Sequence, residues 1–308
     1  MQISILLAQQ IAQLFLILIM GYAVVKAGLL KASDSKVLSV VMVYLVTPCV
    51  IINAFQINDT PEIRKGLLYS MAIAAAIHVV LLGISALLSR PLKLDAVEQV
   101  NVIYSNAAAL VIPLVRALLG DEYVIYSCAF IIVQLILLWT HASSLLQGDR
   151  ALDWKKVFSN INMIAIAAGA LLYWFRVALP APLQNTMSTM GDMIGPMGML
   201  LAGMAIAEKP LRDVFCTRRN YLPTVLRLVV CPLVMLVLLL VCHASSWVAD
   251  GKNILMTVYL AAITPACATV TSMAQLYDRD AAHSSALYVL TTLLSTVSYT
   301  HLTLPTIR

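Results

Sequence analysis

The chain alternates between long runs without charged side chains and short polar segments that contain its Asp, Glu, Lys and Arg residues. A helix that crosses the hydrocarbon core of a bilayer needs about 20 mainly apolar residues. The pattern therefore predicts an all-α, polytopic membrane protein with ten transmembrane helices. The ten uncharged runs that predict them are residues 1–25, 37–58, 66–89, 99–115, 123–148, 157–175, 193–207, 228–249, 253–277 and 281–307.

Two of these runs are short for a membrane-spanning helix. The run 99–115 reaches full length only with the polar residues near Glu98 or Arg116, and the run 193–207 needs residues that precede Asp192. Because the ten runs fill most of the chain, no room remains for a soluble domain. The first run lacks basic residues before its apolar core, and we expect it to be a retained helix and not a signal peptide.

Composition excludes several classes of protein. Of the 308 residues, 61% are hydrophobic and 11% are charged, against about 25% charged in an ordinary soluble domain. The formal net charge is +5, but the basic residues are scattered through short loops, so no nucleic-acid partner is expected. The six cysteines lack metal-binding spacing and are expected to be packing residues, with no metal and no cofactor.

The distribution of Lys and Arg over alternate loops predicts the orientation, because these residues accumulate in cytoplasmic loops. One set of loops contains most of them, and the other set contains few. The expected topology places both termini outside a cytoplasmic membrane. The rich set comprises Lys26, Lys31, Lys36, Arg90, Lys93, Arg150, Lys155, Lys156, Lys209, Arg212, Arg218, Arg219 and Arg279; the poor set comprises Arg64, Lys65, Arg116, Arg176 and Lys252.

A polar segment near residues 147–156 divides the chain into two groups of five predicted helices, residues 1–149 and 150–297. Because five is odd, the two halves would insert with opposite orientations. Thr47-Pro48 interrupts the second apolar run of the first half, and Gly195-Pro196 interrupts the second run of the second half. The fourth runs match as well, with Asn106 before Pro113 in one and Thr264-Pro265 in the other. The order of these interruptions predicts an inverted repeat.

Each of these prolines removes a backbone donor and displaces the carbonyl of the preceding turn. Hydrocarbon cannot satisfy the freed carbonyls, so such breaks persist where they line a polar cavity. Paired broken helices in inverted repeats are typical of binding sites in membrane carriers, since half-helix N-termini attract anions. A simple proline kink is the alternative for any single proline.

These motifs together resemble the auxin efflux carrier family of membrane transporters, which includes bacterial malate and malonate permeases and plant auxin carriers. The resemblance covers nearly the whole length. It rests on Gly21-Tyr22, Gly28-Leu29-Leu30, Thr47-Pro48, Asn106 with Pro113, the segment 195–203 (Gly-Pro-Met-Gly-Met-Leu-Leu-Ala-Gly), and Thr264-Pro265-Ala266.

The resemblance implies ten helices in two inverted five-helix repeats, with helices 4 and 9 crossing at their broken centres beside the substrate. It also implies a fixed scaffold and a moving transport part. The chain departs from the family pattern at Ala108 and Val111, which replace two glycines of the fourth helix. It also departs over residues 298–308, which look like translated sequencing-adapter sequence, and we expect this tail to be non-native.

The expected substrate-binding residues flank the predicted breaks, where amides and hydroxyls could bind an anion. They are Asn106, Pro113, Thr264, Pro265, Thr269 and Asn53. The alternative for Asn106 is hydrogen bonding between helices, and the alternative for both threonines is a bond to the backbone of their own helix.

Three polar or ionisable residues and a series of glycines within or beside the apolar runs carry further expectations. His78 could exchange a proton with the aqueous phase, although a bond to a backbone carbonyl is the favoured interpretation. Gln134 should meet a partner on another helix. Arg227 could pair with an anionic substrate, but snorkelling to the headgroups is favoured. The glycines from Gly191 to Gly203 should permit close helix packing.

The sequence predicts a secondary transporter that moves small organic anions, such as carboxylates, by alternating access. An ATP-binding phosphate loop and intramembrane protease motifs are absent from the sequence, so an enzyme is not expected. An anion channel is the alternative, because broken helices also build selectivity filters. The expected partners are the lipid bilayer, the small organic anion and a second copy of the chain in a homodimer.

Overall fold

The computed structural model describes residues 2–56, 60–107, 111, 115, 118–148, 159–208, 210–248 and 250–303, and its regular structure there is helical. The first part of the chain forms α1 (Gln2–Lys26), α2 (Ser35–Val41), α3 (Thr47–Ala54), α4 (Pro61–Ser89), α5 (Ala96–Ile103), α7 (Val124–Leu137) and α8 (Ser143–Gln147). The second part forms α10 (Ile161–Trp174), α11 (Ala181–Asp192), α12 (Ile194–Ile206), α13 (Leu211–Cys216), α14 (Arg218–Val225), α15 (Cys231–Val241), α16 (Gly251–Ile263), α17 (Ala268–Leu276) and α18 (Ala281–Thr303).

Five helical stretches of the described chain are long and apolar enough to cross a membrane by length and composition: Ala32–Ala54, Ile63–Ser89, Val124–Gln147, Ala181–Ile206 and Arg218–Val241. Shorter apolar helices cover Ala12–Lys26, Ile161–Trp174 and Gly251–Ile263. Large apolar side chains remain exposed on the outer sides of these helices, as contact with lipid requires. The membrane-spanning character is confirmed, while the count of ten stays a prediction.

The short run 193–207 does extend backwards past Asp192, as its length requires. α11 ends at Asp192, Met193 forms a single turn, and α12 begins at Ile194, so that Pro196 lies inside the helix. Pro48 also lies in continuous helix, because a π-helical turn, Met42–Val46, precedes it and takes up the displaced backbone. The Thr47 hydroxyl donates to the Met42 carbonyl at 2.8 Å. Pro48 therefore does not break its helix, whereas the helix that contains Pro196 is interrupted just before it, at Met193.

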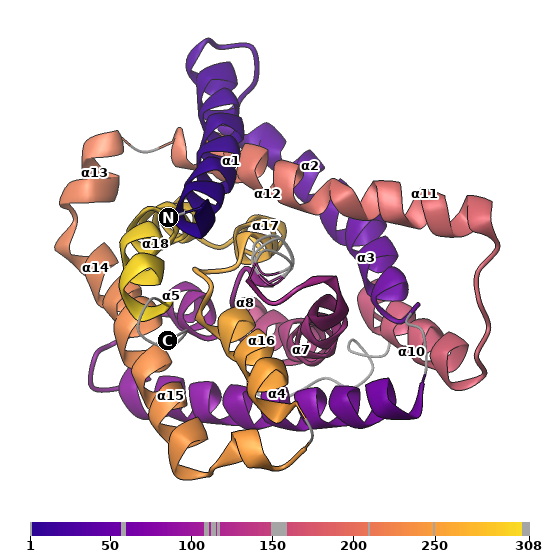
Figure 1. Ribbon diagram of the computed structural model, residues 1–308. Helices are drawn as coiled ribbons and strands as arrows, with labels where there is room; N and C mark the ends of the chain where they lie inside the picture. The colour runs from indigo at the N-terminus through magenta and orange to yellow at the C-terminus, as the bar shows by residue number, and fades with distance from the viewer. Residues whose placement is uncertain are drawn as a thin grey trace.

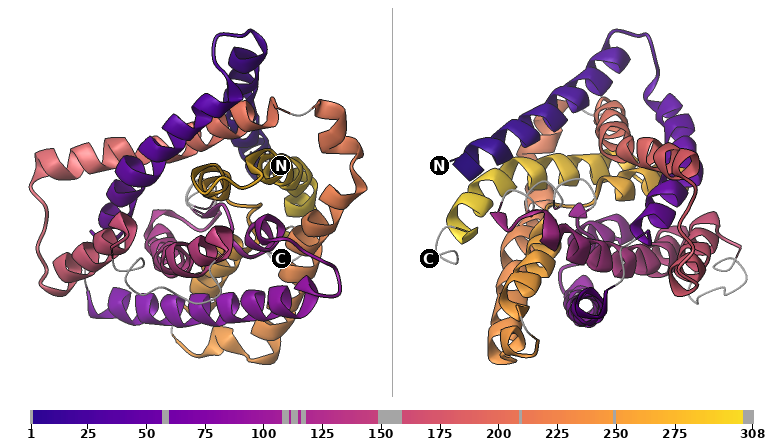
Figure 2. Two further views of the ribbon diagram at one scale, coloured as in Figure 1. Left: turned by 180° about the vertical axis from the view of Figure 1, so that it is seen from behind. Right: turned by 45° about the vertical axis from the view of Figure 1, so that its right-hand side comes forward.

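The helices form two groups that meet where α12 packs on α17 and α18. In one group α1 packs on α12, and α3 packs on α10 and α11. In the other group α4, α7 and α16 pack together, and α18 packs on α14 and α17. Figure 1 shows α5, α7, α16 and α17 near the centre, with α4 and α15 along one side and α1, α11 and α12 along the other. Figure 2 shows the same arrangement from two further directions.

Glycines allow α1 and α12 to approach backbone to backbone, which confirms the expected packing role. A Cβ atom at Gly203 would overlap the Leu18 carbonyl oxygen, and one at Gly21 would overlap the Leu200 carbonyl oxygen. At both positions the obstruction is backbone, which cannot rotate away as a side chain can.

We expect Gly203→Val to destabilise the protein by about 3 kcal/mol or more, because overpacking forces the two helix backbones apart. At about 2–4 °C for each kcal/mol, the melting temperature of the purified protein would fall by about 6 °C or more. Gly83→Val is the matched control, since a Cβ at Gly83 meets nothing within 4 Å. Equal melting temperatures for the two variants would contradict the packing argument.

Candidate functional site at a crossing of two broken helices

Two helices are interrupted in mid-course, and their interruptions lie against one another. α5 ends at Ile103, residues 104–106 are not helical, and helix resumes at Ala107. α16 ends at Ile263, and α17 begins only at Ala268. The two interruptions run antiparallel, with the Asn106 amide donating to the Pro265 carbonyl at 2.8 Å and the Cys267 amide donating to the Tyr104 carbonyl at 3.1 Å.

This crossing has two chemically different sides. The C-terminal ends of α5 and α16 reach it from one side and present carbonyl groups. α17 begins on the other side and presents amide groups at its N-terminal end, and helix also resumes there at Ala107. A helix dipole is negative at its C-terminus and positive at its N-terminus, so the two sides attract opposite charges.

Arg227 occupies the carbonyl side. Its side chain is 1% exposed, and its guanidinium donates to the Thr264 carbonyl at 2.7 Å and the Ala262 carbonyl at 2.5 Å. It also donates to the carbonyls of Val102 and Ile103 at 3.1 and 3.2 Å. The predicted snorkelling of Arg227 to the headgroups is therefore wrong. The cation is held inside the protein because it satisfies carbonyls that both helix ends leave without helical partners.

Gln134 holds the first break in place from α7. Its side-chain oxygen accepts from the Ser105 amide at 3.0 Å and from the Ser105 hydroxyl at 2.7 Å. Its side-chain nitrogen donates to the Ser105 carbonyl at 2.9 Å. The expectation that Gln134 meets a partner outside its own helix is confirmed, and the partner is the buried, non-helical residue Ser105 of the break itself.

Residues of α18 border the crossing and were not anticipated from the sequence. The Tyr288 hydroxyl lies 3.5 Å from the Asn106 side-chain nitrogen and donates to the Met199 sulfur at 2.9 Å. The Ala266 amide donates to the Thr291 hydroxyl at 3.2 Å. A tyrosine and a threonine within an apolar run are ordinary in sequence, so only the three-dimensional contacts identify them.

The structure brings four of the predicted residues together. Asn106, Thr264 and Pro265 lie within the two breaks, and Thr269 lies in the first turn of α17. The Thr264 hydroxyl donates to the Ala261 carbonyl of its own helix at 3.0 Å, as the alternative interpretation of Thr264 expected. Pro113 lies outside the described residues.

Two other predicted residues lie apart from the hydrogen bonds of the crossing. Asn53 is near the end of α3, which packs mainly on α10 and α11, and its role stays a prediction. His78 is fully buried, and its Nδ1 lies 2.8 Å from the Ala74 carbonyl, which confirms the bond to backbone. Its ring centroid is 6.5 Å from that of Tyr104, so it lies beside the break, and among the described residues Nε2 has no hydrogen-bond partner.

A second polar cluster fixes the start of α5. The Glu98 side chain is 1% exposed, and Arg219 donates to its two oxygens at 2.6 and 2.5 Å. Asp95, Glu98 and His283 place potential metal ligand atoms within 4.8 Å of one another. Because both Glu98 oxygens bind Arg219, the ion pair explains the cluster without a metal. Arg219 and Arg227 thus anchor both ends of α5 from one continuous helix.

Comparison with known proteins agrees with this architecture. The model of a family described as membrane transport protein matches residues 6–153 and 150–303, which together span nearly the whole chain. No curated protein sequence matches the chain. The family is one of transporters and not of enzymes. The chain therefore belongs to the auxin efflux carrier-like family of membrane transport proteins.

Proposed function

We propose that this membrane transporter is a secondary carrier of small organic anions, such as carboxylates, which bind at the crossing of the two broken helices. The observation that supports the proposal best is the asymmetry of the crossing. Arg227 binds the carbonyl ends of α5 and α16. The helix N-termini on the other side are therefore left as the electropositive surface, and N-termini favour anions.

The polar groups on that side suit a carboxylate. Asn106 and Thr269 offer an amide and a hydroxyl as hydrogen-bond donors, and Tyr288 adds a second hydroxyl beside Asn106. These donors are uncharged, so an anion could leave as well as bind. A site for release needs this moderate affinity, whereas a lysine or arginine in direct contact would hold a carboxylate more tightly.

Burial and helix grouping support alternating access. Asn106, Thr264 and Thr269 are all buried, so a substrate reaches the crossing only if helices move. The group of α1, α3, α10, α11 and α12 is the proposed scaffold, and the group around α4, α7, α14, α16, α17 and α18 is the proposed moving part. The crossing belongs to the second group and would travel with it.

The proposed topology has ten helices in two inverted five-helix repeats, with the broken helices as numbers 4 and 9. Both termini would lie outside the cytoplasmic membrane, because the loops that are rich in Lys and Arg would then be cytoplasmic. Opposite insertion of two similar halves is supported by the antiparallel pairing of the two breaks. Proton coupling through His78 is an optional addition to this mechanism.

Counterflow in liposomes tests the carrier and its substrate class. Liposomes that contain the full chain are loaded with unlabelled malate, malonate or indole acetate, and uptake of the labelled compound is measured. We expect saturable counterflow for at least one of the three compounds. Linear, non-saturating flux would favour an anion channel, and flux no different from that of empty liposomes would end the carboxylate proposal.

Asn106→Ala tests the position of the site. We expect the apparent affinity for the transported anion to fall about tenfold or more, because a donor is lost where the bound anion would lie, worth about 1.5–3 kcal/mol. Asn185→Ala is the matched control, since Asn185 is exposed on α11. Saturable counterflow with unchanged affinity in Asn106→Ala would mean that the protein is a carrier whose binding site lies elsewhere.

A further inference from the structure

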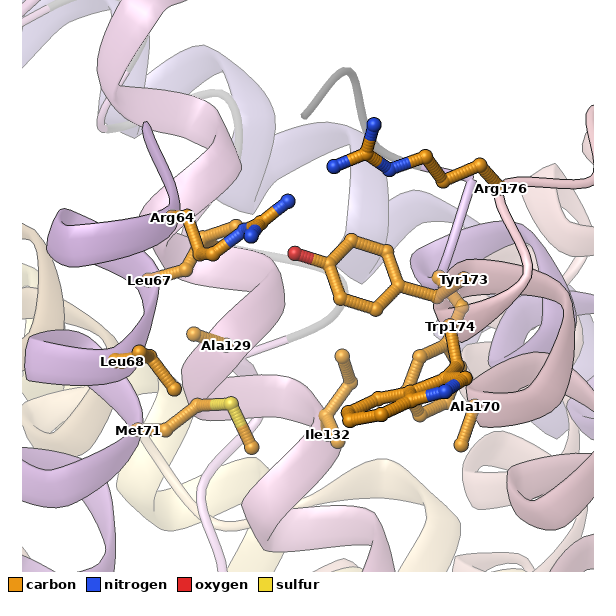
Figure 3. Close-up of a pocket in the computed structure, with 11 residues that line it drawn as sticks. Arg64, Leu67, Leu68, Met71, Ala129, Ile132, Ala170, Tyr173, Trp174 and Arg176 are labelled. Atoms are coloured by element: carbon orange, nitrogen blue, oxygen red, sulfur yellow. The ribbon is translucent and has the colours of Figure 1, made fainter. Parts of the chain in front are cut away.

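A groove of about 510 Å³ lies between the two helix groups, away from the crossing. One wall comes from α4 and α7, and the other comes from α10 and Phe55 at the end of α3. Its floor is apolar, and Figure 3 shows Met71, Ile132 and Trp174 around the lower part of the cavity. The groove has the size of a small-molecule site, but its surroundings differ from those of an aqueous pocket.

Two arginines stand at one end of this groove. Arg64 comes from the first turns of α4, and Arg176 follows the end of α10. In Figure 3 their side chains approach the same end of the cavity from opposite sides, with the Tyr173 hydroxyl between them. Guanidinium groups bind phosphate through paired N–H donors, so this end is suited to a phosphate group.

The arginine end of the groove has the features of a membrane–water interface. Both arginines lie at helix ends, and Tyr173 and Phe175 lie at the end of α10, as aromatic residues do at the headgroup level. Trp174 is 79% exposed and Leu68 is 61% exposed. The apolar part of the groove is thus open to the lipid-facing surface, where hydrocarbon chains would lie.

We propose that this groove binds an anionic phospholipid, with the phosphate between Arg64 and Arg176 and an acyl chain along Met71, Ile132 and Trp174. The charge at one end and the apolar floor at the other match the two parts of such a lipid. The bound lipid would contact both helix groups. A site of this kind is separate from the crossing, and its occupancy can be measured whether or not the proposed transport activity is correct.

Native mass spectrometry of the detergent-purified full chain tests the proposal, with phosphatidylglycerol and phosphatidylcholine of equal chain length as probes. We expect retention of phosphatidylglycerol at concentrations at which phosphatidylcholine is lost. The double variant R64Q/R176Q should bind phosphatidylglycerol about tenfold more weakly, because two charge-assisted contacts are removed. R90Q/R218Q is the control, since it makes the same change in net charge at exposed arginines.

Ala170→Trp distinguishes binding of a lipid in the groove from binding of a small anion at the two arginines. Ala170 is exposed and lines the groove, so tryptophan there should fill it without overpacking the protein and should abolish phosphatidylglycerol retention while both arginines remain. Glycerol phosphate added in excess should not displace the lipid. Undiminished retention in either the double variant or Ala170→Trp, displacement by glycerol phosphate, or equal retention of both lipids would overturn the proposal.

Discussion

Arg227→Met should lower the stability of the protein by about 3–5 kcal/mol, because several backbone carbonyls lose a charged donor. The guanidinium donates to four carbonyls at the ends of α5 and α16. Methionine keeps much of the volume and removes every donor. Although the cost of burying a cation disappears, four carbonyls lose their partner, at about 1–3 kcal/mol for each unsatisfied group, so the loss should dominate.

The readout is the melting temperature of the purified protein, which should fall by about 6 °C or more at about 2–4 °C for each kcal/mol. Arg218→Met is the control, because Arg218 is exposed at the start of the same helix. Arg227→Lys should lie between the wild type and Arg227→Met, since an ammonium keeps the charge but lacks the planar fork of donors. A melting temperature of Arg227→Met equal to that of Arg218→Met would show that the carbonyls find other partners.

Arg227 should also affect the proposed function, although its side chain would not contact the anion. Its charge cancels the negative ends of two helix dipoles beside the crossing, so its loss should weaken anion binding as well as stability. Transport per folded molecule should therefore fall more in Arg227→Met than in Arg227→Lys. Counterflow measured well below the melting temperature of both variants separates this effect from unfolding.

The sequence identified the second break at Thr264-Pro265, where a proline stands in an otherwise apolar run. It placed the first break after Asn106, at Pro113, whereas the helix is already interrupted at residues 104–106. Such local signals were also misleading at Pro48, where a π-helical turn and the Thr47 hydroxyl keep the helix continuous. Whether a proline kinks or breaks a helix depends on such local compensation, which the proline alone does not reveal.

The sequence could not reveal which groups satisfy the broken backbone. Snorkelling and burial of Arg227 are both compatible with its distance from the nearest loop along the chain. The outcome depends on carbonyls supplied by α5 and α16, which are remote in sequence and become neighbours only at the crossing. The default rule that an arginine inside a membrane run has a specific partner would have been the better guide. Tyr288 and Thr291 carried no comparable signal.

Gln134→Leu should lower the stability of the protein by about 2–5 kcal/mol, because it removes the hydrogen bonds that hold the first break, residues 104–106. The leucine side chain is similar in size, but the Ser105 amide and carbonyl then lose the partner that they have in Gln134. In hydrocarbon-like surroundings no water replaces that partner, at about 1–3 kcal/mol for each backbone group. We expect the melting temperature of the purified protein to fall by about 4 °C or more, at about 2–4 °C for each kcal/mol.

Gln147→Leu is the control for this variant, because Gln147 continues the same helical stretch and its side-chain nitrogen donates to the Ser143 hydroxyl at 2.8 Å. One side-chain hydrogen bond is lost there, so the change should stay near 1 kcal/mol. If the crossing is the transport site, Gln134→Leu should also reduce counterflow per folded molecule, since a shift of Ser105 moves the adjoining Asn106. Reduced stability with unchanged counterflow would mean that transport does not depend on the position of Ser105 and Asn106. The substrate would then bind elsewhere.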